Sequence, residues 1–174
     1  MMSLNFGLLP EDRQKQGLHL KWSINHNNSL PVIDECTNGI FLSSKKEYDI
    51  STKMKELLAI KAPTVDTPSG SLSGGNQQKV VIAKQLAAKS KIIVLDEPTK
   101  GVDVGSKAQI YQLMSDLAAQ GMGILMISSE MPKVINMSDR IYVMSEGHVT
   151  KEFNASGITQ EEILTAAMPV ERGE

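Results

Sequence analysis

The spacing of apolar residues along the chain predicts a series of amphipathic helices. Over residues 46–60 the apolar side chains recur every three or four positions, which places them on one helix face. The same period covers 73–89 and 106–120, and shorter helices are expected at 132–136 and 159–167. The positions that we expect to face inward are Ile50, Met54, Leu57, Leu58, Ile82, Ala83, Leu86, Ile110, Leu113, Met114 and Leu117.

Short apolar runs without the helical period predict strands. Residues 92–95 and 123–128 are largely continuous apolar stretches, which is typical of buried strands in a parallel sheet. The helix between them implies a right-handed parallel crossover. Residues 141–144 and 148–153, joined by the turn signal Ser145–Gly147, predict an antiparallel hairpin.

Three other stretches show no clear period. The chain begins abruptly at Leu8–Arg13, where we expect no preceding element, and residues 23–45 are polar and are predicted as loop with some helix. Residues 62–71 contain two prolines, a glycine and several hydroxyl side chains, so they predict a linker.

Composition and charge narrow the classes of protein to consider. The chain has 174 residues, of which 41% are hydrophobic and 22% charged, which is typical of one globular domain with a small appendage. The net charge is −2 and no basic stripe is visible, which argues against nucleic-acid binding. Cys36 is the only cysteine, so we expect a reducing compartment, and no apolar run is long enough to cross a bilayer.

A glycine-rich segment stands at the start of one predicted helix. Ser73 is followed by Gly74 and Gly75. Unpaired amides and the helix dipole attract an anion at such a place, and glycine lets the anion approach the backbone closely. A capped helix after a flexible linker explains Ser-Gly-Gly, taken alone, equally well.

Two adjacent carboxylates, Asp96 and Glu97, follow the predicted strand at 92–95. Open α/β sheets bind ligands at the carboxyl ends of their strands. One carboxylate can hold Mg²⁺ through its water shell, and the next can polarise an attacking water. A polar turn at the end of the strand is the alternative.

Two further polar segments follow predicted strands. Gly101–Gly105 is either a loop that positions groups across an interface or a plain connector into the next helix. Ser128 and Ser129 end the next strand, at the same sheet edge as Asp96, and a helix cap is the simpler explanation for them. The histidines show no ligand spacing, so they predict no metal site.

Taken together, these segments resemble those of the ATP-binding subunits of ABC transporters. Leu72–Gln77 is similar to the signature motif, Ile92–Glu97 to the Walker B strand with its catalytic glutamate, and Gly101–Asp103 to the D-loop. Other stretches resemble the second nucleotide-binding half of sugar importers of the ribose and galactose type, and the likeness runs from about residue 7 to residue 168. These stretches are Pro10–Arg13, Asn76–Lys79, Glu97–Gly105, Ser128–Pro132 and Met137–Arg140.

The chain also departs from the family pattern. No glycine is followed by lysine, so the phosphate-binding loop Gly-x-x-x-x-Gly-Lys is missing. Ser129 stands at the position of the switch histidine, and Glu11 at that of the Q-loop glutamine. The resemblance implies a C-terminal fragment of a tandem subunit. The residues Met1-Met2-Ser3-Leu4 look like a start codon followed by a cloning remnant. The resemblance also implies that the chain's own ATP site is degenerate and hydrolyses ATP slowly or not at all.

The resemblance implies roles for individual residues. Ser73, Gly74 and Gly75 would be donated in trans to the γ-phosphate of an ATP molecule held by the first nucleotide-binding half. Asp96 would contact Mg²⁺, and Glu97 would face the attacking water. Ser129 joins Glu97 as a position of the catalytic site, and the other expected ATP contacts are Gln77, Asp103 and Glu11.

The expected fold is α/β, a partial P-loop NTPase sheet of the ABC ATPase type with a small helical subdomain and without the Walker A region. We expect the helical subdomain and a Q-loop-like segment at 5–70, and the C-terminal part of the ATPase core at 71–168. A sheet that lacks its phosphate-loop strand has an exposed edge, which a homodimer of the fragment could cover.

The expected function is that of an ATP-binding and ATP-hydrolysing subunit of a bacterial ABC importer for sugars. Its partners would be the first nucleotide-binding half, the membrane permease subunits and, indirectly, a periplasmic or extracellular sugar-binding protein. The subunit would be cytoplasmic and peripheral on the inner face of the cell membrane. The alternative is a nucleotide-independent permease-docking or regulatory module that acts through residues 14–60. Soluble ABC proteins of ribosomes or DNA ends are disfavoured, because they keep the switch histidine and need a basic surface.

Overall fold

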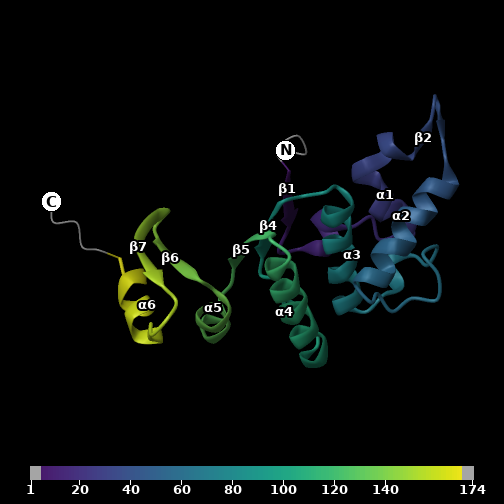
Figure 1. Cartoon of the computed structure of the whole chain (residues 1–174). Coiled ribbons are helices and arrows are strands. Elements are labelled where there is room, and N and C mark those ends of the chain that lie inside the picture. Colours follow the sequence, from purple (N-terminus) through teal and green to yellow (C-terminus); the bar gives the residue numbers. More distant parts are fainter. Residues whose placement is uncertain (1–4, 170–174) are drawn as a thin grey trace. The chain divides into compact units, whose positions relative to one another are not determined.

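The computed structural model describes residues 5–169, and the chain divides into two compact units between Ile127 and Ser128 (Figure 1). The first unit contains a parallel sheet and most of the helices, and the second contains a hairpin with two helices. The boundary between the two compact units thus lies far from residue 70, where the motifs predicted the end of the helical subdomain and the start of the ATPase core.

The sheet of the first unit has three parallel strands in the order β1 (Phe6–Leu9), β4 (Ile92–Asp96) and β5 (Gly123–Ile127). The α/β fold with a parallel sheet is therefore confirmed. The expectation that no element precedes Pro10 is wrong, because β1 pairs with β4 along its whole length. Four residues are too few to show a period, and this strand forms where β4 offers it a partner.

The register of the strands brings their carboxyl ends level. Leu9 pairs with Leu95, and Asp96 pairs with Ile127. Glu11 follows β1 by two residues, and Glu97 follows β4 directly. The segments after β1 and β4 therefore begin at one edge of the sheet, as the sequence predicted for parallel strands.

Strand β5 differs from the buried strand that its apolar run predicts. Its residues alternate between exposed and half-buried, and the side chains of Leu125 and Ile127 are 51% and 50% exposed. Within residues 5–169, β5 pairs with β4 on one side and with no strand on the other. The expected exposed edge of the sheet is thus confirmed, and it explains why the strand is not buried.

Two helices adjoin the sheet (Figure 1). Helix α3 (Gly74–Ala87) buries nearly its whole middle section, and it contacts β1. Helix α4 (Val104–Ala119) contacts α3 and β5 and buries Ile110, Met114 and Leu117 as predicted. Leu113 is only half-buried, because it lies at the margin of the inward face.

Residues 13–71, which fall mostly within the predicted helical subdomain at 5–70, contain more regular structure than expected. A π-helical turn (Arg13–Gly17) precedes α1 (Ile24–Ser29) and a 3₁₀ segment (Leu30–Cys36). A short hairpin, β2 (Thr37–Asn38) with β3 (Phe41–Leu42), then leads into α2.

Helix α2 (Ser44–Leu57) packs against α1 and α3, and Figure 1 shows α1 and α2 in blue beside α3. Met54 and Leu58 are buried as predicted, whereas Leu57 is 56% exposed. Leu57 is the last helical residue, so the chain turns away before its side chain reaches the core. A 3₁₀ turn (Ser69–Ser71) then leads to α3.

The second unit confirms the predicted hairpin and flanking helices. Strands β6 (Arg140–Ser145) and β7 (His148–Asn154) are antiparallel, between α5 (Met131–Met137) and α6 (Gln160–Ala167). Thr159 and Glu162 form the predicted capping box at the start of α6. The core of this unit consists of Ile141, Val143, Ala155 and Ile163. None of the helices in residues 5–169 is long and apolar enough to span a bilayer.

Candidate functional site

The start of α3, which we call the α3 tip (Ser73–Gly75), has the features of an anion-contacting helix end. Ser73 is the N-cap residue, but its side chain makes no capping bond, and its Oγ instead accepts from Nδ2 of Asn76 at 2.9 Å. The first intrahelical bond runs from the amide of Gln77 to the carbonyl oxygen of Ser73. The amides before Gln77 have no acceptor inside the helix, so they can bond a ligand.

The two glycines of the α3 tip are required by contacts within the chain. A Cβ on Gly74 would lie 2.5 Å from the carbonyl oxygen of Gly101, and a Cβ on Gly75 would lie 2.5 Å from the Cβ of Ser106. Both distances are far below van der Waals contact, so any larger residue displaces the loop or α4. The sequence suggested that these glycines let a ligand approach the backbone. In the structure they let the chain's own loop at Gly101 and the side chain of Ser106 approach it.

Gln77, an expected ATP contact, is engaged inside the chain. Its side chain is buried, and its Oε1 accepts from Nε2 of Gln14 at 3.1 Å and from Nε of Arg13 at 3.4 Å. Its Nε2 donates to the carbonyl oxygen of Ser69 at 3.3 Å. In this arrangement Gln77 joins three segments of the first unit.

Asp96 and Glu97 lie at the carboxyl end of β4, as expected. Glu97 has a φ of +45°, a left-handed conformation that is rare for a residue with a side chain. Its amide donates to the carbonyl oxygen of Ile127 at 2.9 Å, and its own carbonyl accepts from the amide of Lys100 at 3.0 Å. These bonds hold a strained backbone at the predicted catalytic residue, and such strain is common in functional sites.

The D-loop-like segment is a tight turn that ends in a helix cap. Gly101 has a φ of +65°, which favours glycine. Asp103 is the N-cap of α4, and its Oδ1 accepts from the amide of Ser106 at 2.9 Å. The hydrogen bonds from Ser106 lower the pKa of Asp103. The segment is therefore a connector into α4 whose cap holds Ser106 against Gly75, and the positioning of groups across an interface stays a prediction.

Glu11, at the position of the Q-loop glutamine, forms an exposed ion pair with Lys100. The hydrogen bond from Lys100 to Glu11 raises the pKa of the ammonium group. The two residues border a shallow hollow of about 420 Å³ whose other lining residues are Asp12, Arg13, Gln14 and Gly101. The hollow thus lies between the segment after β1 and the D-loop-like turn.

Ser129, the residue at the switch-histidine position, belongs to the second unit and is exposed. The neighbouring Ser128 accepts a bond from the amide of Glu130 through its Oγ, at 3.1 Å. Helix α5 begins at Met131, and its N-cap is Glu130. The hydroxyl of Ser128 therefore closes a small turn before α5 and does not cap the helix itself.

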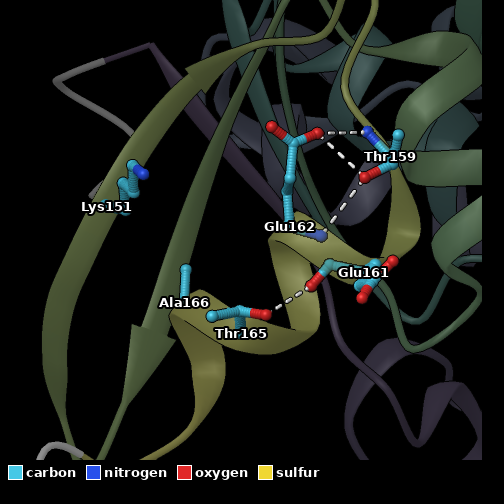
Figure 2. A pocket seen from close by; sticks show the side chains of 6 residues that line it. All are labelled: Lys151, Thr159, Glu161, Glu162, Thr165 and Ala166. Atoms are coloured by element: carbon cyan, nitrogen blue, oxygen red, sulfur yellow. Dashed lines mark hydrogen bonds between the residues drawn. The ribbon is translucent and has the colours of Figure 1, made fainter.

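A second hollow, of about 310 Å³, lies on the second unit and is bordered by Lys151, Thr159 and Glu162 (Figure 2). Glu162 folds back onto Thr159, with its Oε2 accepting from the amide at 2.9 Å and from Oγ1 at 2.8 Å. These bonds lower the pKa of Glu162. Two of the polar side chains that border this hollow, Thr159 and Glu162, are thus engaged in the capping box of α6.

The residues present fit part of a magnesium–ATP site. Residues 5–169 contain no cluster of three or more acidic, histidine or cysteine side chains that could hold a metal ion. Asp96 would therefore share Mg²⁺ with phosphate oxygens and water, which is the usual coordination of this ion. The sequence has no loop to enclose a triphosphate. The chain can touch a nucleotide at the α3 tip and at Asp96, but it supplies no phosphate cradle.

Sequence reasoning missed Arg13 and Lys100 as residues that organise the site. Arg13 is 9% exposed and bonds the carbonyl oxygens of the D-loop-like turn. No hydrophobic period marks this arginine, and a charged residue in a polar segment ordinarily predicts exposure. Only the pairing of β1 with β4 reveals that Arg13 faces the turn after β4.

Comparison with known protein families agrees with this geometry. A family model described as ABC transporter matches residues 5–100, which is more than half of the chain. The chain belongs to the ABC transporter family. The matched range includes β1, the α3 tip, β4 and the two carboxylates that follow it.

Curated proteins similar to this chain include ATP-binding proteins of ribose and xylose import. The chain is 48% identical to "Ribose import ATP-binding protein RbsA" of Geobacillus kaustophilus over 92% of this chain and 32% of that protein. It is 44% identical to "Xylose import ATP-binding protein XylG" of the same organism, over 95% of this chain and 33% of that protein. The chain thus spans about a third of the length of the curated relatives that it matches.

Solved structures of ABC transporter cassettes share the fold. The chain aligns with an ATP-binding cassette of an ABC transporter at a TM-score of 0.75, with 22% identity, over 97% of this chain and 70% of that one. A dimeric cassette in a post-hydrolysis state, bound to ADP and phosphate, aligns with a TM-score of 0.71 and 22% identity over 88% of this chain and 64% of that chain. At this identity the likeness establishes the fold.

Proposed function

We propose that the chain is the C-terminal part of the second nucleotide-binding half of an ATP-binding subunit in a bacterial sugar importer. In this role it donates the α3 tip in trans to an ATP molecule held by the first half. The observation that carries the proposal is the tip itself, a helix start whose Ser73 caps no amide, in a chain without a phosphate-binding loop. Such a tip can contact a phosphate but cannot enclose a triphosphate.

The residues of the site act at two places, the α3 tip and the carboxyl end of β4. At the tip, the hydroxyl of Ser73 and the amides of Gly74 and Gly75 can donate to phosphate oxygens, and hydrogen bonds to an anion are stronger than neutral ones. At the carboxyl end of β4, Asp96 would hold Mg²⁺, which neutralises phosphate charge when bound. Glu97, fixed by its strained backbone, would orient an attacking water.

Because the sequence departs from the family pattern at Ser129 and Glu11, we assign the α3 tip a larger role in ATP hydrolysis than the carboxyl end of β4. Ser129 cannot reach a phosphate as an imidazole does, and Glu11 is engaged in an ion pair with Lys100. We infer that the ATP site in cis hydrolyses slowly or not at all. The competent site is then the one that the α3 tip completes on the first half, and its closure and reopening would drive the transport cycle.

The partners follow from the same assignment. The names of the relatives, ribose and xylose import ATP-binding proteins, support a role in sugar uptake. The subunit would bind membrane permease subunits at the cytoplasmic face of the cell membrane, and the permease would receive sugar from a periplasmic or extracellular binding protein. A homodimer of this chain is a further way to cover the outer edge of β5.

One observation favours a second function, permease docking without nucleotide. The turn between β2 and β3 exposes apolar side chains at the tip of the helical subdomain, and Ile40 and Phe41 are 91% and 73% exposed. Exposed apolar patches of this kind often contact another protein. If docking were the whole function, the α3 tip would be dispensable for transport.

The deciding experiment compares substitutions at the two places in the full-length subunit, assembled with its permease in vesicles. Ser73→Arg fills the space over the tip with a long side chain, so we expect at least a roughly hundredfold loss of sugar uptake. Glu97→Gln alters only the degenerate site, so we expect a loss of about threefold or less. Ser156→Arg, the same change in the exposed turn between β7 and α6, is the matched control.

The outcomes separate the two functions. Equal losses for Ser73→Arg and Glu97→Gln, or a larger loss for Glu97→Gln, would contradict the assignment in trans. Transport that is insensitive to Ser73→Arg would favour the docking function. Uptake should remain at the wild-type rate in Ser156→Arg, which would show that an added arginine is not harmful in itself.

A further inference from the structure

Arg13 occupies an unusual position for a charged residue. It lies in the π-helical turn after β1 and is 9% exposed. Burial lowers the pKa of its guanidinium group, and the nearby charge of Asp12 opposes this effect. An arginine is rarely buried unless its donors are satisfied, because desolvation of a charge is costly. The partners of Arg13 therefore indicate what the side chain does.

The guanidinium of Arg13 bonds the D-loop-like turn through two consecutive carbonyl groups. Its Nη1 donates to the oxygen of Lys100 at 2.7 Å, and its Nη2 donates to the oxygen of Gly101 at 2.9 Å. Two parallel bonds fix the direction as well as the distance of the turn, which a single ammonium group cannot do. The positive φ of Gly101 belongs to the turn that presents these two oxygens.

The same guanidinium also contacts helix α3. Its Nε donates to Oε1 of Gln77 at 3.4 Å. A Cβ on Gly74 would lie 2.7 Å from Nη2 of Arg13, in addition to its clash with the oxygen of Gly101. The α3 tip thus packs against both partners of the hydrogen bond between Arg13 and the turn.

The contact continues through buried polar groups into the helical subdomain. Nε2 of Gln77 donates to the carbonyl oxygen of Ser69, and Nδ2 of Asn27 donates to Oγ of Ser69 at 3.1 Å. Asn27 also bonds the backbone of His19 through both its amide oxygen and its amide nitrogen. Arg13 therefore stands at one end of a bonded chain that reaches α1 and fixes the approach to the α3 tip.

We propose that Arg13 is a positioning residue that holds the α3 tip at a fixed distance from the D-loop-like turn. The juxtaposition that carries the proposal is one guanidinium in contact with the turn after β4, with Gln77 and with Gly74. The inference rests on the proposed function in one respect, namely that the tip so positioned contacts a phosphate. Gln77 acts with Arg13, as a second positioning residue and not as an ATP ligand.

The neighbouring ion pair between Glu11 and Lys100 cannot replace this contact. Both side chains are roughly half exposed or more, and exposed ion pairs contribute little to stability. The pair joins the same two segments through charge. Of these two contacts, the one made by the guanidinium group of Arg13 also reaches the α3 tip.

Amide hydrogen exchange on the 174-residue chain tests the positioning role without any nucleotide. In Arg13→Met the amides of Gln77, Lys100 and Val102, each bonded within the tip or the turn, should exchange at least about tenfold faster. The amide of Met114, deep in α4, should exchange at the wild-type rate. Arg140→Met, which removes an exposed arginine of the second unit, is the control and should change none of these rates.

A conservative variant keeps the test decisive if Arg13→Met does not fold. Arg13→Lys retains the charge but can bond only one carbonyl group well. We expect it to fold and to show faster exchange at Lys100 and Val102, by about threefold or more. Wild-type exchange at these amides in either folded variant would overturn the proposal, as would full recovery in Arg13→Lys, since charge alone would then suffice.

ATP hydrolysis by the full-length subunit supplies the functional readout. Arg13→Met should lower kcat about tenfold and leave KM for ATP within about twofold, because the first half grips the nucleotide. Faster exchange with an unchanged kcat would overturn the positioning role and leave Arg13 merely structural. If instead Ser73→Arg left hydrolysis intact, the assignment in trans would fail, and the exchange rates would still decide the part played by Arg13.

Discussion

The α3 tip and strand β5 lie in the same unit but differ in how completely the chain packs them. At the tip, a Cβ on Gly74 would lie 2.5 Å from the oxygen of Gly101, so no space is left. On β5, Leu125 and Ile127 are 51% and 50% exposed, and within residues 5–169 the outer edge of the strand is unpaired. The chain's own atoms complete the packing of the tip but not that of β5.

Contacts within the chain fix the geometry of the α3 tip, whereas the outer edge of β5 is open to contact with another surface. Close-packed backbone contacts leave little room for movement, so the tip keeps its shape without a partner. An apolar edge strand, in contrast, is normally paired or covered. A group that contacts a phosphate in a fixed geometry needs such rigid packing, which agrees with the role that we propose for the tip.

The largest effect is expected where the packing of the tip is tightest. Gly74→Ala forces a methyl group against the carbonyl oxygen of Gly101, which is backbone and cannot swing aside. We expect the free energy of unfolding of the first unit to fall by about 2–3 kcal/mol. Urea unfolding followed by the fluorescence of Trp22, the only tryptophan, measures this.

Gly105→Ala is the matched control for that substitution. A Cβ on Gly105 would find its nearest neighbour, Oδ1 of Asp103, at an ordinary 3.5 Å. Because alanine favours the helical conformation, we expect stability to hold or to rise by up to about 1 kcal/mol. Unfolding of the two alanine variants at the same urea concentration would contradict the tight packing of the tip, which is one side of the comparison with β5.

A smaller effect should be reversible by a second substitution. Gly75→Ala places its methyl group 2.5 Å from the Cβ and 2.7 Å from the Oγ of Ser106, and these belong to a side chain. Removing that side chain in Ser106→Gly should relieve the clash. We expect a coupling energy of about 1–2 kcal/mol in the double-mutant cycle, measured by the same unfolding curves. Simple additivity of the two single effects would show that the tip does not press on α4.

The parts of the fold that sequence predicts well are those with strong local signals. The helical spacing of apolar residues around Ile110 and Met114 locates α4, and the run of apolar residues at 92–95 locates β4. Each of these patterns is longer than one turn of a helix or one repeat of a strand. Strand β1 has only four residues and forms because β4 pairs with it. Strand β5 looked buried from its composition, but exposure depends on which strands lie beside it, and composition does not encode that.

The candidate site shows the same limit. The positions of Asp96 and Glu97 follow from strand order, and the structure places both at the predicted edge. The contacts of Arg13 and Gln77 span more than sixty positions of sequence, so no local pattern can announce them. The sequence singled out the glycines of the α3 tip as ATP contacts, which stays a prediction, and their close contacts with Gly101 and Ser106 depend on tertiary packing that no local pattern reveals.

The smallest expected effect concerns the cap that holds Ser106 against the tip. The bonds from Ser106 lower the pKa of Asp103 below its ordinary value of 3.8. A carboxyl whose pKa is lower in the folded state stabilises the fold fully above its unfolded pKa, and it loses this contribution as pH falls through the folded pKa. Asp103→Asn keeps a capping side chain without a charge. We therefore expect nearly equal urea midpoints at neutral pH and, below about pH 4, a steeper decline in the wild type than in the variant. Parallel curves over the whole range would contradict this linkage, because the charge of Asp103 would then contribute nothing to the stability that the cap provides.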